Sequence, residues 1–409
     1  MDRNRIVVQK YGGTSVGSVD RIKKVADRIK TYVDDGMGVV VVVSAMGKTT
    51  DQLVSLASEI NTEPSDREMD MLLSTGEQVS ISLLAMALHK IGIDAISFTG
   101  SQIKVRTEGR HSDGRIVSID TERINESLDK GRVVIVAGFQ GIDSDENIMT
   151  LGRGGSDTSA VALAASLDIP VCEIFTDVDG VYTADPRIVS HPRKLNEVSY
   201  DEMLELARLG AGVLHSRAVE FAKKYKVMLH VRSSFEYSEG TIVKSEEDLM
   251  EKFVLSGVTA KKDEAKFTIR NIPDAPGIAA TVFDTFGRNG VYVNMIVQSM
   301  GAENHADISF TAPKKDFALV HNLLDQLDSE LGSSGHTASE NIAIVSAVGV
   351  GMLSSAGVAG RLFKVLAEHK INIHMISTSE IGISCVIDDM YAELAVNAIH
   401  KEFIENMQQ

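Results

Sequence analysis

Short apolar runs alternate with helical patterns over the first two thirds of the chain. The runs have strand length and little polar alternation; they lie at residues 6–9, 39–44, 133–137, 171–176 and 227–231. Between them, hydrophobic residues recur with helical spacing, first over residues 19–33. Strands that are apolar throughout are buried on both faces, so the pattern predicts an α/β fold with a mostly parallel sheet covered by helices.

The pattern is interrupted at residues 238–252, which are polar and acidic and contain Gly240, and this composition indicates a linker. Beyond the linker the sequence repeats itself. Residues 276–299 align without gaps to residues 356–379, an offset of 80. Each copy reads strand, glycine turn, amphipathic helix, strand, so we expect two small α+β modules.

Composition narrows the function classes. A net charge of −16 over 409 residues argues against a nucleic-acid partner, because such binding needs a basic surface. The two cysteines, Cys172 and Cys385, lack metal-ligand spacing and fit a reducing cytoplasm. The charged start leads directly into a strand, so no signal peptide is expected, and the most apolar run, residues 39–43, is too short to span a bilayer.

Two glycine-rich turns carry candidate chemistry. KYGGTS, residues 10–15, follows the first strand, where Gly12 and Gly13 would let backbone N–H groups approach a phosphate and Lys10 could reach it. LGRGGSDTS, residues 151–159, precedes a helix expected at residues 160–166 and offers a guanidinium fork at Arg153. The alternatives are a plain turn with a solvated lysine, and a helix cap by Ser156 or Asp157 beside an exposed arginine.

Two other glycine motifs are rejected. Gly47-Lys48-Thr49 resembles a P-loop, but Val42 stands where the first glycine is required. Gly349-Val350-Gly351 resembles a dinucleotide-binding turn, but Ser354 replaces the third glycine.

Three carboxylates remain open to two interpretations. Asp177 and Asp179 follow the run at 171–176, as metal ligands or as turn residues around Gly180. Glu77 enters an apolar helix, either as an acidic first-turn residue or as the buried partner of a substrate ammonium.

Taken together, these segments resemble the amino-acid kinase family and, within it, the aspartate kinases. The resemblance rests on KYGGTSVGS at 10–18, SFTGSQ at 97–102, GFQGIDSDENIMTLGRGGSDTSA at 138–160 and FTDVDGVYTADPR at 175–187. The C-terminal repeats resemble ACT domains, the amino-acid-sensing modules of that family. The resemblance implies an αβα-sandwich catalytic domain over residues 1–240, a linker and first regulatory strand over 241–262, and ferredoxin-like ACT domains over 263–338 and 339–409.

The same resemblance implies an enzyme that transfers the γ-phosphoryl group of ATP to the β-carboxylate of L-aspartate, the first step toward lysine, threonine and methionine. It assigns the nucleotide to Lys10, Tyr11, Gly12, Gly13, Ser15, Thr176, Asp177, Tyr182 and Arg187, and aspartate to Ser44, Thr50, Glu77, Arg153 and Ser156. Lys10, Arg153 and Glu77 would be the catalytic groups. Mg²⁺ would be held mainly by the nucleotide phosphates, without a dedicated protein metal site.

Regulation is implied at the repeats. Asp274, Gly277, Ala279 and Gln298 would bind a lysine or threonine effector, completed by Asn372, Ile373 and Thr378 of the second module. An oligomer formed through the ACT domains is expected, and Met250 is a candidate internal start for a shorter subunit. One departure from the family stands at Gly212, where many relatives carry a phosphate-facing lysine.

Two other functions compete with this hypothesis. The chain could be another acyl-phosphate-forming kinase of the same fold, acting on glutamate or acetylglutamate. It could also be a catalytically silent amino-acid sensor that uses only the repeats. Glu77 and the paired modules favour aspartate over the first alternative, and the presence of Lys10, Arg153 and Asp177 argues against the second.

Overall fold

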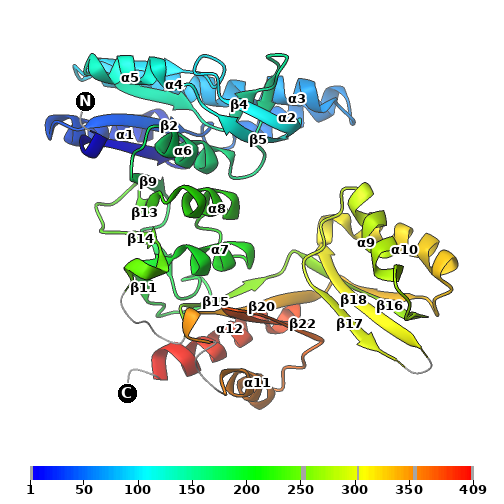
Figure 1. Ribbon diagram of the computed structural model, residues 1–409. Helices are drawn as coiled ribbons and strands as arrows, with labels where there is room; N and C mark the ends of the chain where they lie inside the picture. The colour runs from blue at the N-terminus through cyan, green and yellow to red at the C-terminus, as the bar shows by residue number, and fades with distance from the viewer. Residues whose placement is uncertain (1–2, 250–254, 302–303, 353–356, 407–409) are drawn as a thin grey trace. The chain divides into compact units, whose positions relative to one another are not determined.

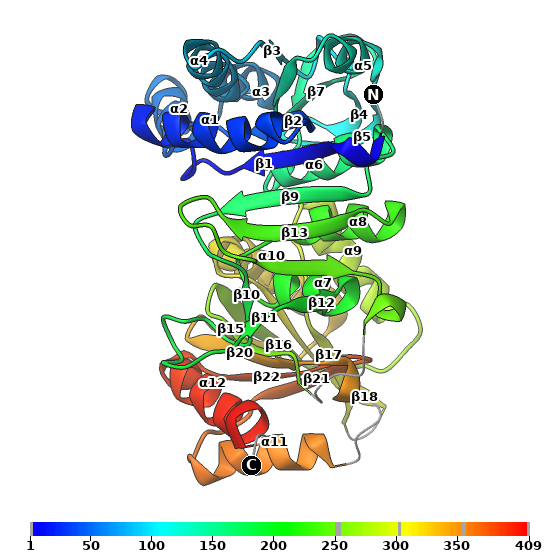
Figure 2. The same ribbon diagram turned by 90° about the vertical axis from the view of Figure 1, so that its left-hand side faces the viewer.

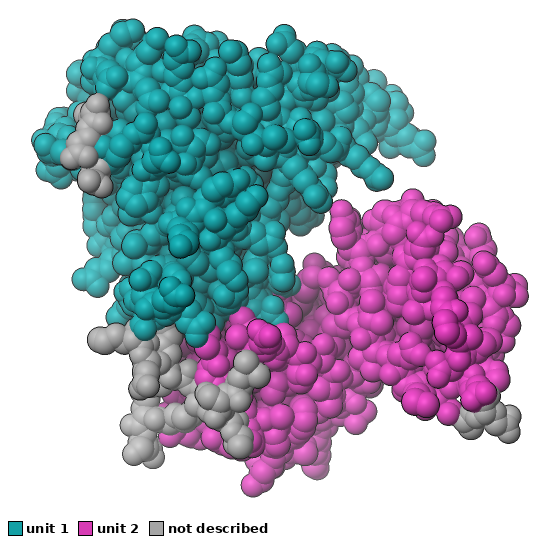
Figure 3. Space-filling model, viewed as in Figure 1, with its two compact units in different colours: residues 1–181, 194–208, 212–251 teal, residues 182–193, 209–211, 252–409 magenta. Residues whose placement is uncertain are grey.

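A computed structural model describes residues 3–249, 255–301, 304–352 and 357–406. The chain divides into two compact units, coloured separately in Figure 3. The first unit comprises residues 1–181, 194–208 and 212–251, and the second comprises residues 182–193, 209–211 and 252–409. Met250, the candidate internal start, lies outside the described residues.

The first unit is built on an eight-stranded sheet (Figures 1 and 2). In spatial order its strands are β12 (Glu197–Ser199), β14 (Thr241–Lys244), β13 (Met228–Ser233), β9 (Val171–Thr176), β1 (Ile6–Tyr11), β2 (Gly38–Val43), β6 (Val133–Ala137) and β3 (Ala95–Phe98). Every neighbouring pair from β13 to β3 is parallel, and β14 runs antiparallel to β13. The expected mostly parallel sheet is confirmed.

Helices cover both faces of this sheet because its central strands have no polar face. All six residues of β2 are buried. Helices α1 (Val19–Asp34) and α4 (Thr75–Lys90) share one hydrophobic core with the sheet. Helix α6 (Gly155–Ser166) packs on β1, β2 and β9 and against α8 (Ser216–Tyr225). This layering leaves the carboxyl ends of the strands outside the core, and the first glycine-rich turn, residues 10–15, begins at one of them, the end of β1.

The remaining elements of the first unit surround this sandwich. They are α2 (Thr49–Ile60), α3 (Asp66–Leu73), α5 (Glu122–Asp129), α7 (Tyr200–Arg208) and a small sheet of β5 (Asp113–Ser118), β4 (Arg106–Arg110), β7 (Gln140–Ile142) and β8 (Ile148–Thr150). Together α3 and α4, Asp66–Lys90, are long and apolar enough to cross a bilayer by length and composition. Core helices of soluble proteins pass the same test, and α4 buries Leu84 and Leu88 completely in the core just described.

A buried polar network connects the central strands. Glu173 on β9 accepts hydrogen bonds from Gln9 Nε2 at 2.9 Å, Tyr32 OH at 3.0 Å and Arg232 Nη1 at 2.9 Å. The carboxylate is 5% exposed, so its three donors replace the water that burial removes. The network links β1, β9 and β13 through their side chains, and its member Gln9 directly precedes the first glycine-rich turn.

The second unit holds two four-stranded antiparallel sheets. The first module contains β16 (Glu264–Pro273), α9 (Ile278–Arg288), β17 (Ile296–Met300), β18 (His305–Pro313), α10 (Phe317–Leu331) and β19 (His336–Ser339). Its strand order is β17-β18-β16-β19, the ferredoxin-like order expected for each repeat. Phe267, Phe286 and Phe310 are fully buried between this sheet and its helices.

The second module has the same strand order, but one of its four strands comes from another part of the chain. It contains β20 (Ile342–Val348), α11 (Val358–Glu368), β21 (Met375–Ser379), β22 (Gly382–Asp388) and α12 (Ala392–His400). Its edge position beside β20 is filled by β15 (Gly257–Lys261), which precedes the first module in the chain. The first module is therefore an insertion between two strands of the second.

The observed units bear on the expected domain boundaries. β14, at residues 241–244, pairs within the first unit's sheet, although the expected catalytic domain ends at residue 240. Residues 182–193 belong to the second unit: Ala184 and Val189 lie in the same core as Leu362 and Ile399. The boundaries proposed from the sequence remain predictions.

Candidate functional site

The turn after β1 places its lysine beside the start of α6. Lys10 Nζ lies 2.5 Å from Asp157 Oδ1, and the two side chains are 11% and 13% exposed. Gly12 N–H donates to the carbonyl of Phe175 at 3.3 Å, and a Cβ on Gly12 would stand 3.4 Å from Lys10 Nζ. The turn thus holds a cation against backbone that carries no side chain, an arrangement suited to an anionic ligand.

Three segments meet at Ala45, just after β2. A Cβ on Gly13 would lie 2.8 Å from the Ala45 carbonyl oxygen, and one on Gly76 would lie 2.8 Å from Ala45 Cβ. Gly47 N–H also donates to the carbonyl of Gly13 at 3.0 Å. Only glycine allows this approach, so these glycines bring the turn after β1, the turn after β2 and the first turn of α4 into direct contact.

Glu77 lies in this junction as a buried carboxylate. Its Oε1 accepts the Ala45 N–H at 3.0 Å, and the residue is 3% exposed. Among the described residues, its buried Oε2 has no hydrogen-bond partner. Burial raises the pKa of Glu77 to about 7, against the opposing effect of the backbone hydrogen bond from Ala45. A buried carboxylate with one unsatisfied oxygen is well placed to receive a cationic ligand group.

The second glycine-rich turn forms the start of α6. Gly154 is the N-cap residue with a φ of 69°, and the helix begins at Gly155, five residues before the start expected from the sequence. Ser156 and Asp157 therefore lie in the first helical turn, and neither is the N-cap residue. A Cβ on Gly138 would lie 2.9 Å from Ser156 Oγ, so the turn after β6 also packs closely here.

Arg153 projects from this turn as an exposed side chain. In the part of the chain that the structure describes, no hydrogen bond or ion pair engages its guanidinium. Arg217 holds the turn in place by donating to the Leu151 carbonyl at 2.7 Å and the Gly114 carbonyl at 2.5 Å. The guanidinium of Arg153 is thus left available to a carboxylate or phosphate.

The other residues expected at this site occupy the same turns. Ser44 N–H donates to the Tyr11 carbonyl at 3.1 Å, and Thr50 lies in the first turn of α2. Ser15 is buried, and its hydroxyl has no partner among the described residues. The ring of Tyr11 is fully buried and stacked on Phe175, with the ring centroids 4.7 Å apart, so a nucleotide contact by Tyr11 would come from its backbone.

The residues after β9 divide between the two units. Thr176 Oγ1 donates to Asp177 Oδ1 at 3.2 Å, and Asp179 Oδ2 pairs with Lys194 Nζ at 3.4 Å, all within the first unit. Tyr182 and Arg187 belong to the second unit. There Arg187 forms a forked contact with Asp185, through Nε to Oδ1 at 3.0 Å and Nη2 to Oδ2 at 2.6 Å.

Sequence reasoning missed two members of this site. It considered Asp157 only as a cap, whereas the structure pairs it with Lys10. His215 was not singled out, yet a Cβ on Gly154 would lie 2.2 Å from its Cγ, and its buried Nδ1 has no partner among the described residues. Burial lowers the pKa of His215. No local pattern signals either contact, because each joins segments far apart in the chain.

Gly212, the departure noted in the sequence, lies in open space. A Cβ at this position would meet no heavy atom within 4 Å, and Gly212 is not one of the glycines whose backbone φ is positive. The Cβ of a lysine at this position would therefore meet no steric barrier.

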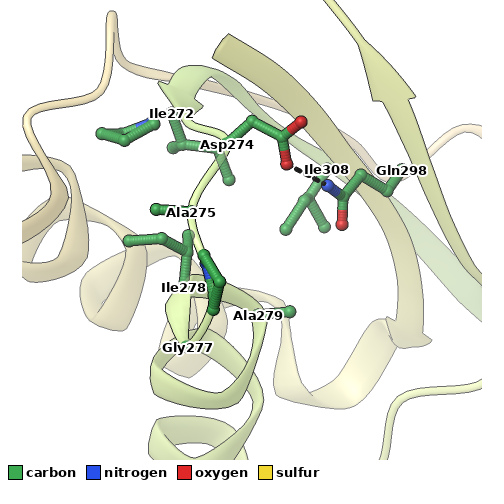
Figure 4. Close-up of a pocket in the computed structure, with 10 residues that line it drawn as sticks. Ile272, Asp274, Ala275, Gly277, Ile278, Ala279, Gln298 and Ile308 are labelled. Atoms are coloured by element: carbon green, nitrogen blue, oxygen red, sulfur yellow. Dashed lines mark hydrogen bonds between the residues drawn. The ribbon is translucent and has the colours of Figure 1, made fainter. Parts of the chain in front are cut away.

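A second candidate site lies in the first repeat module (Figure 4). A cavity of about 300 Å³ is lined by Ile272, Pro273, Asp274, Ala275, Pro276, Gly277, Ile278, Ala279, Gln298 and Ile308. Within this lining, Gln298 Nε2 donates to Asp274 Oδ1 at 3.2 Å. Gly277, at a φ of 100°, is the N-cap of α9, so this cavity joins a carboxylate to the N–H groups of a helix start.

Four of the expected effector residues thus line one cavity: Asp274, Gly277, Ala279 and Gln298. The other three lie on the second module and are not among the lining residues. Asn372 and Ile373 precede β21, and Thr378 lies within it opposite Ile383.

Both halves of the chain match models of known protein families. Residues 5–233 match the model of the amino acid kinase family, and residues 270–326 and 345–403 match an ACT domain model. An aspartokinase of Geobacillus stearothermophilus is 52% identical over 97% of both chains. An aspartate kinase of Stutzerimonas stutzeri is 50% identical, also over 97% of both chains.

Solved structures agree with this similarity. Aspartokinase III of E. coli in complex with aspartate and ADP superposes with a TM-score of 0.83 at 26% identity, covering 97% of this chain and 99% of the other. The same enzyme in complex with lysine and aspartate gives a TM-score of 0.77 at 26% identity, covering 98% of this chain and 100% of the other.

The burial of the Glu77 carboxylate leads to a testable prediction about how the stability of the protein depends on pH. Because the folded pKa of Glu77 lies above its ordinary value of 4.5, wild-type stability falls relative to a neutral variant as pH rises from about 4.5 through 7. We expect Glu77→Gln to gain stability over wild type between pH 5 and pH 8 by on the order of 2 kcal/mol. Urea unfolding at both pH values measures the difference. The exposed Glu59→Gln on α2 is the control, and an equal response of the two variants would contradict the buried ionisation.

Proposed function

This chain belongs to the amino acid kinase family and, within it, to the aspartate kinases, and on that basis we propose that it transfers the γ-phosphoryl group of ATP to the β-carboxylate of L-aspartate. The product is 4-phospho-L-aspartate. The observation that carries the substrate assignment is Glu77, a buried carboxylate with one oxygen unsatisfied among the described residues. In this assignment Glu77 receives the α-ammonium of aspartate.

The proposed anchors select an α-amino acid by charge. Glu77 accepts a hydrogen bond from the Ala45 N–H, and Ala45 packs closely against Gly13 in the turn that contains Lys10. Arg153 precedes the helix whose Asp157 pairs with Lys10. Glu77, the negative anchor, and Arg153, the positive anchor, are therefore each connected to Lys10 through a short chain of contacts. Arg153 would pair with the α-carboxylate, while Ser44, Thr50 and Ser156 would supply neutral hydrogen bonds.

The chemistry needs little from the protein beyond position and charge. The β-carboxylate is already ionised at neutral pH, so no general base is required. One of its oxygens forms a bond to the γ-phosphorus as the bond to the ADP oxygen breaks, and ADP leaves with that electron pair. Lys10 and the N–H groups near Gly12 and Gly13 would stabilise the charge on the transferring oxygens. Asp157 would hold Lys10 in place between turnovers.

The residues after β9 fit a magnesium nucleotide. Asp177 is an exposed carboxylate at the carboxyl end of a central strand, the kind of oxygen ligand that Mg²⁺ uses alongside nucleotide phosphates. When bound, the ion would neutralise phosphate charge. Thr176 would be a further nucleotide contact within the first unit, whereas Tyr182 and Arg187 of the second unit are proposed by resemblance alone. E. coli aspartokinase III, a relative by fold and sequence, binds ADP and aspartate in its solved complex.

Feedback control is proposed at the cavity of the first module. Asp274 would receive an effector ammonium and the start of α9 its carboxylate, with Gln298 between them. Asn372, Ile373 and Thr378 would complete the site from the second module. Lysine and threonine are the proposed effectors, and the lysine complex of E. coli aspartokinase III supports the first of these.

Further proposals follow from the same membership. The reaction would open the biosynthesis of lysine, threonine and methionine, in the cytoplasm. The active form would be an oligomer built through the ACT domains, accompanied by a shorter subunit if translation also starts at Met250.

An assay of ADP release with a panel of acceptors tests the proposed activity. Turnover should depend on aspartate, with glutamate and acetylglutamate far weaker. Acetylglutamate lacks the ammonium that Glu77 would receive, so a preference for it would overturn the assignment. Absence of turnover with every acceptor would instead support a silent sensor.

The first mutational prediction concerns Lys10. Lys10→Ala should lower kcat by on the order of 10²-fold or more, because one preorganised charge is lost at the transferring group. The ATP KM should change less. Steady-state kinetics measure both, with Lys23→Ala as control, since Lys23 is an exposed lysine paired with Asp20 on α1. A normal kcat in Lys10→Ala would remove Lys10 from the mechanism.

If Arg153 pairs with aspartate, substitutions of Arg153 should change the KM for aspartate and not the KM for ATP. Arg153→Lys keeps the charge but loses the planar fork, so the aspartate KM should rise roughly tenfold or more. The ATP KM should stay within about twofold, the scale of an uninvolved surface substitution. Initial rates over a grid of both substrates separate these effects. A variant that altered only the ATP KM would refute the assignment.

Gly212 offers a gain of function. Gly212→Lys adds a cation in open space, and the ATP KM should fall about threefold, the scale of a solvent-screened charge pair. Gly212→Ala fills the same space without charge and should leave the ATP KM unchanged. If both variants match wild type, the position does not face the phosphates.

The effector cavity supplies the last prediction. Asp274→Ala and Gln298→Ala should each raise the inhibitor concentration needed for half inhibition roughly tenfold or more, and leave uninhibited kcat unchanged. Inhibition curves with lysine, threonine and both together make the measurement. Asp284→Ala is the matched control, since Asp284 is an exposed carboxylate of α9 paired with Arg288. Wild-type curves in both cavity variants would place the effector elsewhere.

A further inference from the structure

Three potential metal ligands converge on the first repeat module, and none of them belongs to either site described above. His321 and Asp325 lie one turn apart on α10, and His336 is the first residue of β19. One ligand atom from each of the three lies within 4.8 Å of the others. The two imidazole rings meet edge to face, with centroids 4.7 Å apart.

A fourth residue fixes one of these ligands. Asp328 Oδ2 lies 2.6 Å from His336 Nδ1, and Ser333 Oγ donates to the other oxygen of Asp328. An ionised carboxylate only accepts hydrogen bonds, so in the neutral His336 ring Nδ1 carries the proton and Nε2 keeps its lone pair. Orientation of a histidine by a carboxylate in this way is characteristic of metal sites.

Local ion pairing explains only part of this arrangement. His321 Nδ1 lies 3.5 Å from Asp325 Oδ2, a common pairing across one helical turn, and Asp328 orders the turn that leads to β19. Neither contact requires the two imidazoles to face each other across two elements. Two protonated rings at this spacing would repel, whereas a shared cation would attract all three ligands.

We propose that His321, Asp325 and His336 bind a divalent transition-metal ion of the zinc class. Two imidazoles and a carboxylate suit Zn²⁺ and disfavour Mg²⁺ or Ca²⁺, which take oxygen ligands. Tetrahedral bonds of about 2.0–2.1 Å place ligand atoms about 3.4 Å apart, so ligand atoms that lie as far as 4.8 Å apart must close by up to about 1.4 Å. The side chains of His321 and Asp325, 45% and 61% exposed, have room to move, while that of His336, 7% exposed, stays fixed.

The bound ion would join α10 to the first residue of β19, and water would fill the fourth position. This binding is independent of the kinase reaction, since none of the three ligands belongs to the proposed active site or lines the effector cavity. Its expected consequence is a more stable first module, because a ligand that binds only the folded form stabilises it.

The test uses the untagged full-length protein after removal of metals with a chelator. Titration with Co²⁺ should produce the visible d–d absorption of a tetrahedral site at one ion per chain, and Zn²⁺ should displace it. Zn²⁺ alone should also raise the melting temperature. His321→Ala and Asp325→Asn, both on the helix surface, should each weaken Co²⁺ affinity about tenfold or more.

His369→Ala is the matched control, a histidine of the second module whose Nδ1 contacts the carbonyl of Val365. It should bind Co²⁺ as wild type does. Undiminished binding in His321→Ala, or no d–d absorption in the wild type at millimolar Co²⁺, would overturn the proposal. His336→Ala is informative only if its melting temperature without metal matches wild type, since the variant also removes the partner of Asp328.

Discussion

The proposed active site depends on one close packing contact, the meeting of Gly13, Gly76 and Glu77 around Ala45. The two glycines approach so closely that a methyl group on either would collide with Ala45. The Glu77 carboxylate, which accepts the Ala45 N–H, is buried, and one of its oxygens is unsatisfied among the described residues. Ionising this buried carboxylate therefore costs free energy in the folded protein, and a cationic ligand group would offset that cost.

The same principle organises the opposite side of the site. Gly138 allows the turn after β6 to touch Ser156, and Gly154 allows α6 to begin against His215. That helix start presents Asp157 to Lys10. Besides the phosphate approach proposed for some of them, these glycines bring charged side chains from distant segments within reach of one another. The site is preorganised by backbone packing, as positional catalysis of phosphoryl transfer requires.

Much of the fold could be predicted from local pattern, because parallel strands and amphipathic helices leave periodic signatures. The expected strands at residues 133–137 and 171–176 match β6 and β9, and the two repeat helices begin 80 residues apart, at Ile278 and Val358. The exchange that gives β15 to the second module could not be predicted, since strand pairing across an inserted module leaves no local signal. The ion pair of Lys10 with Asp157 was missed for the same reason. The burial of the Tyr11 ring could not be predicted either, because a motif does not show which way a side chain faces.

Proton release on aspartate binding tests the central claim most directly. If the α-ammonium of aspartate meets Glu77, binding should drive that carboxyl from partly protonated to ionised. Calorimetry at pH 7 in buffers of different ionisation enthalpy should then detect release of roughly half a proton per aspartate, given a pKa of about 7 in the free protein. Glu77→Gln should abolish the release. Aspartate binding at wild-type affinity without proton release would contradict the assignment of Glu77 as the ammonium partner.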